Sequence, residues 1–479
     1  RKSNQGMNLM RFKLAPTLAV VASGMVFPAA YAEEQSLAIE EVVVTARKQE
    51  ESSQDVPIAM TAISEQLENS TIRNLTDLNG FAPNVTIGED GSRGGGGAVI
   101  NIRGISPTRS DDNSFDAPIG VMIDGVYLGT LAGQVLENFD LERVEVLRGP
   151  QGSLFGAGTT GGVIQMVTKR PDGEVGGNIK VDLADYNSSR ISGAVNLPLS
   201  DTMRTRFAFA SLKRDGFVTN SYNDQKLDDR NTLAGRMSFE WDYSDETTIS
   251  LIYENTQADD NRLRAARQFC KQDKFYGCSP FENGQEAVWS PGSYGHWVPY
   301  LQFQYPSLDF TAYRNNPSSD IRSVDLDSTP THETVLQNTV FEIDSAISDT
   351  MNMTFTYSYH TRQYEDYADY DHAVSVVPYQ LGPITANLFY DPTIGNMGRG
   401  EKTFASDVAV DRSTNDSEWA QTELRFTSDY DGAFNFTLGF FNLDSQSATN
   451  YGIATPYMEY WGNVSSGPNA QVFSPASAG

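Results

Sequence analysis

Nine segments of about ten residues, in which apolar and polar side chains alternate, constrain the fold of this chain more than any other feature. They lie at residues 178–186, 190–199, 204–213, 232–242, 247–256, 335–347, 352–362, 418–427 and 434–445. In segment 352–362 the two stripes are Met353, Phe355, Tyr357 and Tyr359 on one side, and Asn352, Thr354, Thr356 and Ser358 on the other. Because side chains alternate across a strand, these segments predict strands with one apolar and one polar face.

The connections between these segments alternate between short and long. Turns of a few residues follow residues 199, 242 and 347, whereas the longest connections cover residues 257–334 and 363–417. Tight turns at one end and long loops at the other are typical of an outer-membrane β-barrel, with one face toward lipid and one toward an aqueous lumen. A soluble β-sandwich or a surface adhesin with the same alternation is the alternative.

The first 32 residues predict export. Arg11 and Lys13 precede the apolar run 14–27, and Ala30-Tyr31-Ala32 follows as a small-residue cleavage signature. This pattern is typical of a secretory signal peptide over residues 1–32, with Met7 or Met10 as the start; a membrane anchor is the alternative. In an exported chain we expect the two cysteines, Cys270 and Cys278, to form a disulfide.

Charge and motif content argue against several functions. The formal net charge is −27, so we expect no nucleic-acid partner, which would require a basic face. The four histidines form no zinc-protease motif, and no nucleophile-elbow motif occurs. We therefore expect neither an enzyme nor a bound metal or cofactor.

Residues 51–172 predict a small α+β domain. We expect strands at residues 55–63 (broken at Pro57), 98–102, 119–123, 126–128, 144–147 and 163–168, and short helices at 64–70 and 76–80. Asp124-Gly125 between two apolar runs is a strong hairpin signal. The glycines of Gly156-Ala-Gly158-Thr-Thr-Gly161 formally fit a dinucleotide motif, but a strand-like segment follows them and no helix. We interpret them as glycines for tight turns and close strand packing.

Four stretches of this chain resemble the plug domain of TonB-dependent outer-membrane receptors. They are EEVVVTARK (40–48), NIRG (101–104), IGVMIDGVY (119–127) and LERVEVLRGPQGSLFGAGTTGGVIQMVTKRP (141–171), in the order found in the family. The resemblance implies a linker with the TonB box at 33–50, a plug at 51–172, and the N-terminal part of a transmembrane barrel with long outer loops at 173–479. Receptors of this kind have about 22 strands around a plugged lumen, so nine segments make an incomplete barrel.

The resemblance also implies how the receptor is energised. The TonB box would be Glu40, Glu41, Val42, Val43, Val44, Thr45 and Ala46. Its three valines favour an extended chain, which can add a strand to a sheet of TonB by main-chain pairing. TonB would act with ExbB and ExbD from the inner membrane. An ordinary first strand of the plug is the alternative for these residues.

Charged residues suggest a lock between plug and barrel. In the family, plug arginines meet barrel acids, and the matching positions here are Arg103 and Arg148 in the plug and Glu423 on a barrel strand. Partly buried charges need partners, because an isolated buried charge is costly. The alternative is that these are ordinary surface charges.

The ligand site is expected where the plug apices meet the outer loops. Candidate ligand-binding residues are Arg93, Arg109, Tyr364 and Tyr367. The acidic run 365–371 is interpreted as a solvated outer loop, with cation binding as the alternative. The resemblance implies uptake of a ferric siderophore or another iron complex across the outer membrane of a Gram-negative bacterium. Uptake of carbohydrate or another organic substrate is the alternative.

Overall fold

A computed structural model describes most of the predicted strands and parts of the loops. Its described residues are 43–45, 47–49, 51–54, 56–69, 72–89, 97–106, 117–129, 137–156, 159–263, 271–274, 277–279, 281–282, 313–314, 320, 322–370, 374–375, 384–386, 390–391, 395–396, 402–404, 408 and 410–454. The chain divides into Arg1–Glu41, which lies outside these ranges, and Val42–Gly479, to which everything below refers. The predicted signal peptide therefore stays a prediction.

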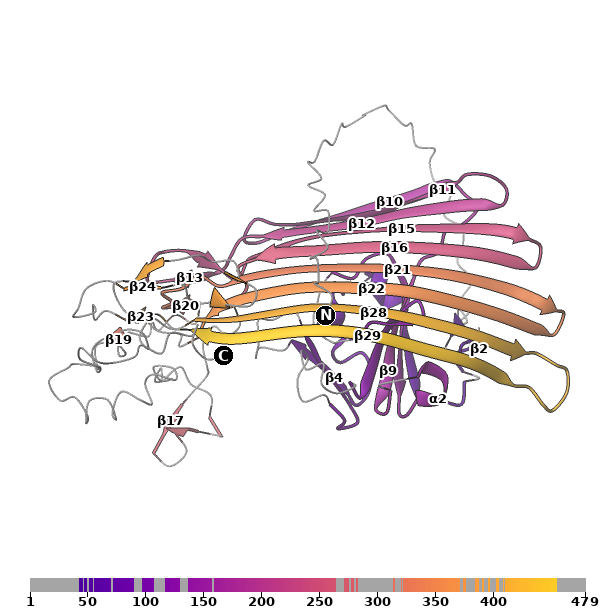
Figure 1. The fold of residues 1–479 in the computed structure, drawn as a ribbon, viewed down its shortest axis with the longest axis horizontal. Helices are drawn as coiled ribbons and strands as arrows, with labels where there is room; N and C mark the ends of the chain where they lie inside the picture. Colours follow the sequence, from indigo (N-terminus) through magenta and orange to yellow (C-terminus); the bar gives the residue numbers. More distant parts are fainter. Residues whose placement is uncertain are drawn as a thin grey trace. The chain divides into compact units, whose positions relative to one another are not determined.

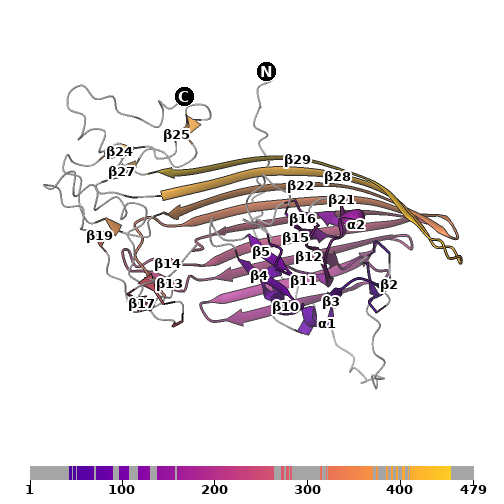
Figure 2. The ribbon, with the colours of Figure 1, turned by 90° about the horizontal axis from the view of Figure 1, so that it is seen from below.

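Residues 43–172, which we call the plug region, form a small mixed structure (Figure 2). A five-stranded sheet has the order β3 (Met60–Ile63), β8 (Leu141–Arg148), β9 (Gly162–Thr168), β6 (Ile119–Ile123) and β7 (Val126–Tyr127). Two-stranded sheets pair β1 (Val43–Val44) with β2 (Glu51–Ser52), and β4 (Val85–Glu89) with β5 (Ala98–Ile102). The helices are α1 (Glu65–Asn69), α2 (Gly152–Phe155) and the 3₁₀ helix η1 (Leu75–Leu78).

An apolar core holds the plug region together. Strands β6, β8 and β9 contribute buried side chains such as Val121, Val146 and Ile164, and η1 contributes Leu75 and Leu78. The side chain of Asn74 caps η1 by accepting hydrogen bonds from the backbone of Thr76 and Asp77. The predicted hairpin at Asp124-Gly125 is present, with both residues at positive φ.

The glycine-rich stretch behaves as a turn and packing element. Gly162 has φ +154, and a Cβ there would lie 2.4 Å from the carbonyl oxygen of Leu147 on β8. Strand β9 begins at this glycine, and no helix follows it. Of the three glycines interpreted as turn and packing residues, Gly156 stands at φ +77 and a Cβ at Gly161 would lie 2.9 Å from Ile105 Cγ2, as expected, whereas Gly158 lies outside the described residues. Strand β4 and helix α2 were not anticipated from the sequence.

The nine predicted barrel segments form one antiparallel sheet (Figure 1). Its order is β10 (Gly176–Ala184), β11 (Ser188–Pro198), β12 (Met203–Arg214), β15 (Arg230–Ser244), β16 (Thr247–Asp260), β21 (Thr331–Ser348), β22 (Met351–Asp369), β28 (Val410–Ser428) and β29 (Thr437–Ala454). Strands β10 and β29 are its edges, so the sheet is open within the described part of the chain. The predicted fold class, an α+β plug followed by an incomplete antiparallel barrel, is confirmed.

The strands extend beyond their predicted ends on the side of the long loops. Strand β22 continues to Asp369, and Asp366 and Asp369 are buried. Asp369 accepts hydrogen bonds from the backbone of Asp327 and Ser328. The interpretation of residues 365–371 as a solvated loop is therefore wrong for 365–369, because paired neighbouring strands stabilise their extended conformation.

Short strands occur in the long connections. Strands β13 (Val218–Asn220), β14 (Lys226–Leu227) and β20 (Ser323–Val324) form a three-stranded sheet around the buried side chains of Val218, Leu227 and Val324. Two-stranded pairs are β17 (Gln272–Asp273) with β18 (Gly277–Cys278), β19 (Tyr313–Arg314) with β23 (Val374–Ser375), β24 (Ile384–Ala386) with β27 (Lys402–Phe404), and β25 (Tyr390–Asp391) with β26 (Gly395–Asn396).

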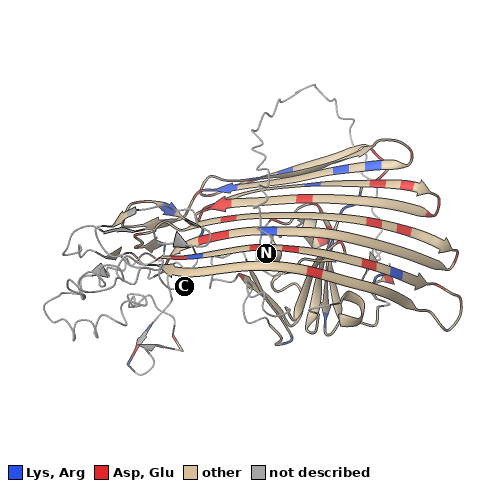
Figure 3. Ribbon diagram, in the orientation of Figure 1, with Lys and Arg blue, Asp and Glu red and all other residues tan. Residues whose placement is uncertain are grey.

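The large sheet has the polarity of a membrane protein. On β22, Tyr357 is 42% exposed, whereas its neighbour Ser358 is 2% exposed. On β12, the rings of Phe207 and Phe209 are exposed and Ala208 between them is buried. Charged residues gather toward the strand ends, with a few in the middle (Figure 3). Large apolar side chains on the open face and small or polar ones on the covered face fit a lipid-facing exterior and a polar interior.

The few helices are short. Across the described residues, none is long and apolar enough to span a membrane.

Candidate functional site between the plug region and the sheet

The second half of the predicted TonB box is docked in the plug region. Val43 and Val44 form β1 and pair with Ser52 and Glu51 of β2. Val44 is fully buried, while Val43 is 46% exposed. Thr45 donates its backbone N–H to Glu145 Oε1 at 2.8 Å. The other predicted box residues, Glu40, Glu41, Val42 and Ala46, lie outside the described residues.

Two further hydrogen bonds support this docking. Arg143 Nε donates to the same carboxylate oxygen of Glu145 at 2.8 Å, and both side chains are buried on β8. Gln165 on β9 donates from Nε2 to Thr45 Oγ1 at 3.0 Å. The chain after the valines is therefore held by polar contacts to two core strands of the plug region.

Lys48 connects this docked segment to the large sheet. Its Nζ lies 3.2 Å from Glu423 Oε2 on β28 and 5.1 Å from the centre of the Phe155 ring. Arg425 shares the carboxylate, with Nη1 at 2.6 Å from Glu423 Oε1. Burial lowers the pKa of Lys48 below its ordinary 10.5, although the charge of Glu423 acts in the opposite direction.

Replacing Glu423 by glutamine is expected to undock the segment. Lys48 would stay buried without a carboxylate, and breaking a buried ion pair from one side costs about 3–5 kcal/mol. The measurement is thiol labelling of a Val43→Cys reporter in the purified protein, which should become faster. The matched control, Lys48→Met, leaves Glu423 paired with Arg425 and should change labelling little. Equal labelling in both variants would contradict this role of the pair.

The same reporter should respond to pH in a defined direction. Because the pKa of Lys48 is lowered in the docked state, the undocked segment binds more protons between that lowered pKa and 10.5. Docking is therefore strengthened as the pH rises through this window. Because thiolate formation itself speeds labelling as the pH rises, the labelling rate is divided by that of the same reporter with Lys48→Met at each pH, and this ratio should fall.

The arginines predicted for the plug–barrel lock lie elsewhere. Arg148 donates to the carbonyl oxygens of Pro83 and Met60, at 3.2 and 3.3 Å, inside the plug region. Arg103 is exposed and stands in a turn at φ +53. Glu423 does meet a plug cation, but this cation is Lys48. Lys48 lies in the motif EEVVVTARK, but nothing in the sequence indicates that it pairs with Glu423.

A second attachment between the plug region and the sheet has the opposite arrangement of charges. The sequence did not predict it. Residues 137–140, which we call the clasp, directly precede β8. Arg190 Nε on β11 lies 2.7 Å from Glu137 Oε2. Arg206 on β12 donates two hydrogen bonds to the Asp140 carboxylate, at 2.8 and 2.6 Å. Here the plug region supplies the acids and the sheet supplies the arginines.

Phe139 occupies an apolar pocket in the middle of the clasp. Its buried ring belongs to a cluster with four alanines of the inner face, Ala194, Ala208, Ala210 and Ala234. Arg236 on β15 lies over the ring, 4.6 Å from its centre, and donates to the Phe139 carbonyl at 3.2 Å. Burial raises the pKa of Glu137, while the hydrogen bond from Arg190 opposes this shift.

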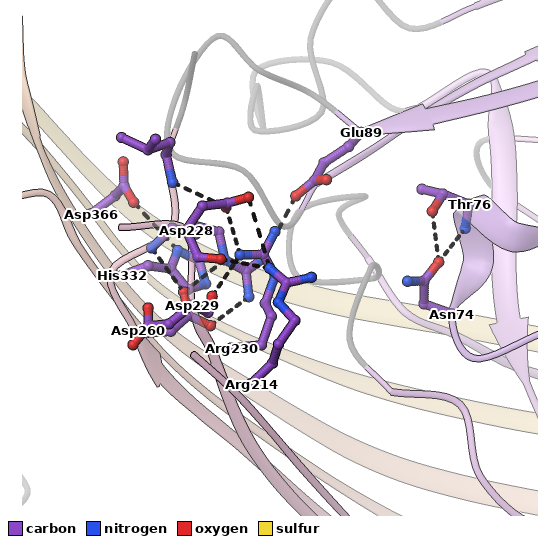
Figure 4. A network of polar contacts seen from close by, with 12 residues as sticks. Asn74, Thr76, Glu89, Arg214, Asp228, Asp229, Arg230, Asp260, His332 and Asp366 are labelled. Atoms are coloured by element: carbon purple, nitrogen blue, oxygen red, sulfur yellow. Dashed lines mark hydrogen bonds and ion pairs between the residues drawn. The ribbon is translucent and has the colours of Figure 1, made fainter. Parts of the chain in front are cut away.

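At the long-loop end of the sheet, a polar network reaches the plug region (Figure 4). Arg262 pairs with Asp260 at the end of β16, at 2.8 Å, and lies 3.7 Å from Glu89 of β4. Nearby, His332 Nδ1 lies 3.3 Å from Asp366 Oδ1. The plug strand β4 is thus linked by charge to the base of the longest loop.

The candidate ligand residues are only partly described. Tyr364 packs edge-on against the His332 ring, with the two centres 5.5 Å apart, and both Tyr364 and Tyr367 are buried. Arg93 and Arg109 lie outside the described residues. Cys270 does too, and only the backbone of Cys278 is described, so the disulfide stays a prediction. No metal-binding group of three or more His, Cys, Asp or Glu side chains occurs within the described part of the chain.

Comparisons with known proteins agree with this architecture. Residues 52–163 match the TonB-dependent Receptor Plug Domain. The chain is 27% identical to the iron-regulated outer membrane virulence protein of Vibrio cholerae over 255 residues, which cover 48% of this chain and 36% of that protein. It is 29% identical to the vitamin B12 transporter BtuB of Vibrio vulnificus over 165 residues, which cover 33% of this chain and 26% of that protein.

The fold is also similar to solved structures. The ferric yersiniabactin uptake receptor FyuA from Yersinia pestis aligns with a TM-score of 0.59 at 15% identity, covering 84% of this chain and 50% of that one. The chain spans half or less of the length of each of these proteins. Residues 52–163 are thus a TonB-dependent receptor plug domain, and the chain shares the plug-and-barrel fold of solved outer-membrane receptors.

Proposed function

We propose that this protein takes up a large, scarce nutrient across the outer membrane, driven by TonB with ExbB and ExbD, and that the nutrient is a ferric siderophore or another iron complex. The similar proteins carry the names of an iron-regulated outer membrane protein and a ferric yersiniabactin uptake receptor. A plug that is held against a barrel wall supports transport, and not catalysis, as the activity of this protein.

One observation carries this proposal: the plug region is held by ion pairs on the polar face of a sheet whose other face is apolar. Arg190 and Arg206 bind the clasp from the covered face. The exposed face presents rings such as Phe207 and Phe209. A lumen blocked in this way admits no large solute until the plug moves, so an energy source such as TonB is required. The docked valines supply the point of attachment.

A second candidate is uptake of a large organic molecule that carries no siderophore-bound iron. It is favoured by the similarity to the vitamin B12 transporter BtuB of Vibrio vulnificus. Carbohydrates belong to the same class of candidate substrate. For either class, we propose that Tyr364 and Tyr367, together with Arg93 and Arg109, contribute to ligand binding.

Growth on single nutrients distinguishes the two candidates. A strain lacking its own copy of the receptor gene should regain growth on one or more ferric siderophores under iron limitation when the gene is returned. The same cells should gain nothing on vitamin B12 or on large oligosaccharides as single sources. Rescue by an organic substrate, with no rescue by any ferric complex, would replace the first candidate by the second.

A further inference from the structure

We propose that the turn between β28 and β29 is inserted into the phospholipid leaflet at its end of the sheet, with three aromatic rings at the boundary between acyl chains and headgroups. We call residues 429–436 the aromatic turn; its rings are Tyr430, Phe434 and Phe436. The turn joins the two strands at the end of the sheet opposite the long loops (Figure 1). The insertion is independent of the nutrient that the protein takes up.

The three rings of the aromatic turn form an exposed cluster. The centre of the Phe436 ring lies 6.4 Å from that of Tyr430 and 6.2 Å from that of Phe434. Phe434 is 73% exposed, and Tyr430 is exposed as well. The other described turns at this end of the sheet carry no aromatic ring; they are residues 199–202, 245–246 and 349–350. A cluster of exposed rings on one of these turns indicates that another surface covers it.

The ring of Phe436 continues the lipid-facing side of the sheet. The ladder pairs Phe426 of β28 with Leu438 of β29. At the next position on the same side, the Ser428 N–H donates to the Phe436 carbonyl at 3.0 Å. Because side chains alternate along an extended chain, Phe436 lies on the same face as Leu438. Leu438 and Phe440 are exposed on this face, so the rings of the turn are continuous with the surface that contacts lipid.

Strand β29 alone offers a short apolar stripe. A transmembrane strand needs about 9–11 residues, and on β22 the apolar stripe extends over residues 351–359. On β29 the stripe consists of Leu438 and Phe440, and the next residues on the same face are Asn442 and Asp444. The rings of the aromatic turn lengthen this stripe at its other end. The membrane boundary at β29 is therefore expected to lie at the turn.

The backbone of the aromatic turn is suited to a lipid environment. Lipid tolerates a turn only where the polar groups of its backbone are paired within the protein. Asn435 Oδ1 accepts from the Tyr430 N–H at 2.6 Å, and Asn435 Nδ2 donates to the Tyr430 carbonyl at 3.0 Å. Ser428 Oγ accepts from the Phe436 N–H at 2.7 Å. Two side chains thus satisfy backbone groups that water would satisfy in a solvated turn.

The charges of the aromatic turn determine its depth. Asp429 and Asp431 are exposed on either side of Tyr430 in the chain. A charged group is costly in hydrocarbon, so these carboxylates belong among the headgroups. Rings at the acyl boundary and carboxylates among the headgroups are compatible at one depth, where membrane proteins concentrate their aromatic residues.

Fluorescence quenching in phospholipid vesicles that contain only this protein tests the insertion. A small fluorophore is attached at Phe434→Cys, and in the control at Asp349→Cys, which lies in the polar turn between β21 and β22 and is exposed. Both proteins have Cys270 and Cys278 replaced by serine. One quencher is phospholipid with bromine on the acyl chain near the headgroup. The other is iodide, present in the water on both sides of the membrane.

Brominated lipid should quench the label at residue 434 severalfold more than the label at residue 349, and iodide should show the opposite preference. In a third protein, Asn435→Ala is added to Phe434→Cys. Because the backbone groups of Tyr430 then lack their partners, the turn should leave the leaflet, and iodide quenching at residue 434 should rise toward that at residue 349.

Three outcomes would overturn the inference. The first is equal quenching of the labels at residues 434 and 349 by iodide. The second is shielding of residue 434 from iodide without quenching by brominated lipid, which would mean that a second copy of the protein covers the rings. The third is that Asn435→Ala changes neither kind of quenching.

Discussion

Deleting residues 40–46 is expected to reduce nutrient uptake to the level of a strain that lacks the receptor. Only Val43, Val44 and Thr45 of this segment are described, and they are docked against β2 and β8. The deletion removes the extended chain that would pair with TonB, while the clasp and the sheet keep all their contacts. The measurement is uptake of a radioactive ferric complex by energised cells, with ligand binding as the control that should not change. Normal uptake by the deletion variant would remove the TonB assignment.

A point substitution sharpens this result. Val43 is half exposed, and among the described residues β1 pairs only with β2, so its other edge is available for main-chain pairing. Val43→Pro removes a backbone N–H and should reduce uptake strongly. The matched control is Val43→Thr, which keeps a β-branched side chain and a full set of backbone donors, and it should transport normally. Equal uptake by both variants would argue against strand pairing at this residue.

Reversing the charge of Asp140 is expected to loosen the plug. Asp140→Arg places a third cation beside Arg206 and Arg236, and leaving a buried charge without its partner costs about 3–5 kcal/mol. Phe139→Ala should cost a similar amount, about 3–5 kcal/mol, because it empties the alanine-lined pocket. Cells carrying either variant should become sensitive to a large antibiotic that the closed receptor excludes.

A charge exchange provides the control for this prediction. In Asp140→Arg combined with Arg206→Asp, opposite charges face each other again, so resistance to the antibiotic should be partly restored. Sensitivity that is unchanged in the single variant, or equal in the single and double variants, would show that the pair does not hold the plug.

The strands of the large sheet could be predicted from the sequence because one physical requirement acts on every residue. A strand between lipid and a polar interior must alternate, as Tyr357 and Ser358 do. The ends were harder to predict. At Asp366 and Asp369 the chain carries acids that resemble a solvated loop, and only their partners on neighbouring strands, His332 on β21 and Val410 on β28, explain the continued strand.

The site was less predictable than the fold. The partner of Glu423 depends on where the chain folds back, and no local sequence pattern indicates this position. The sequence alone therefore does not distinguish Lys48 from Arg103 and Arg148 as the partner. The clasp carries no periodic or motif signal at all: Glu137, Phe139 and Asp140 look like ordinary loop residues until β11, β12 and β15 place arginines and alanines around them.

The most direct test of the central claim compares two neighbouring residues of β22. Nitroxide labels at Tyr357→Cys and Ser358→Cys, in the receptor reconstituted into lipid vesicles, report contact with lipid-soluble oxygen and with a water-soluble nickel complex. We expect strong relaxation by oxygen at residue 357, because its side chain lies on the apolar face, and little relaxation by oxygen at residue 358, which is covered on the polar face. Equal exposure of both labels to the nickel complex, or the reverse preference, would contradict a membrane barrel whose polar face holds the plug.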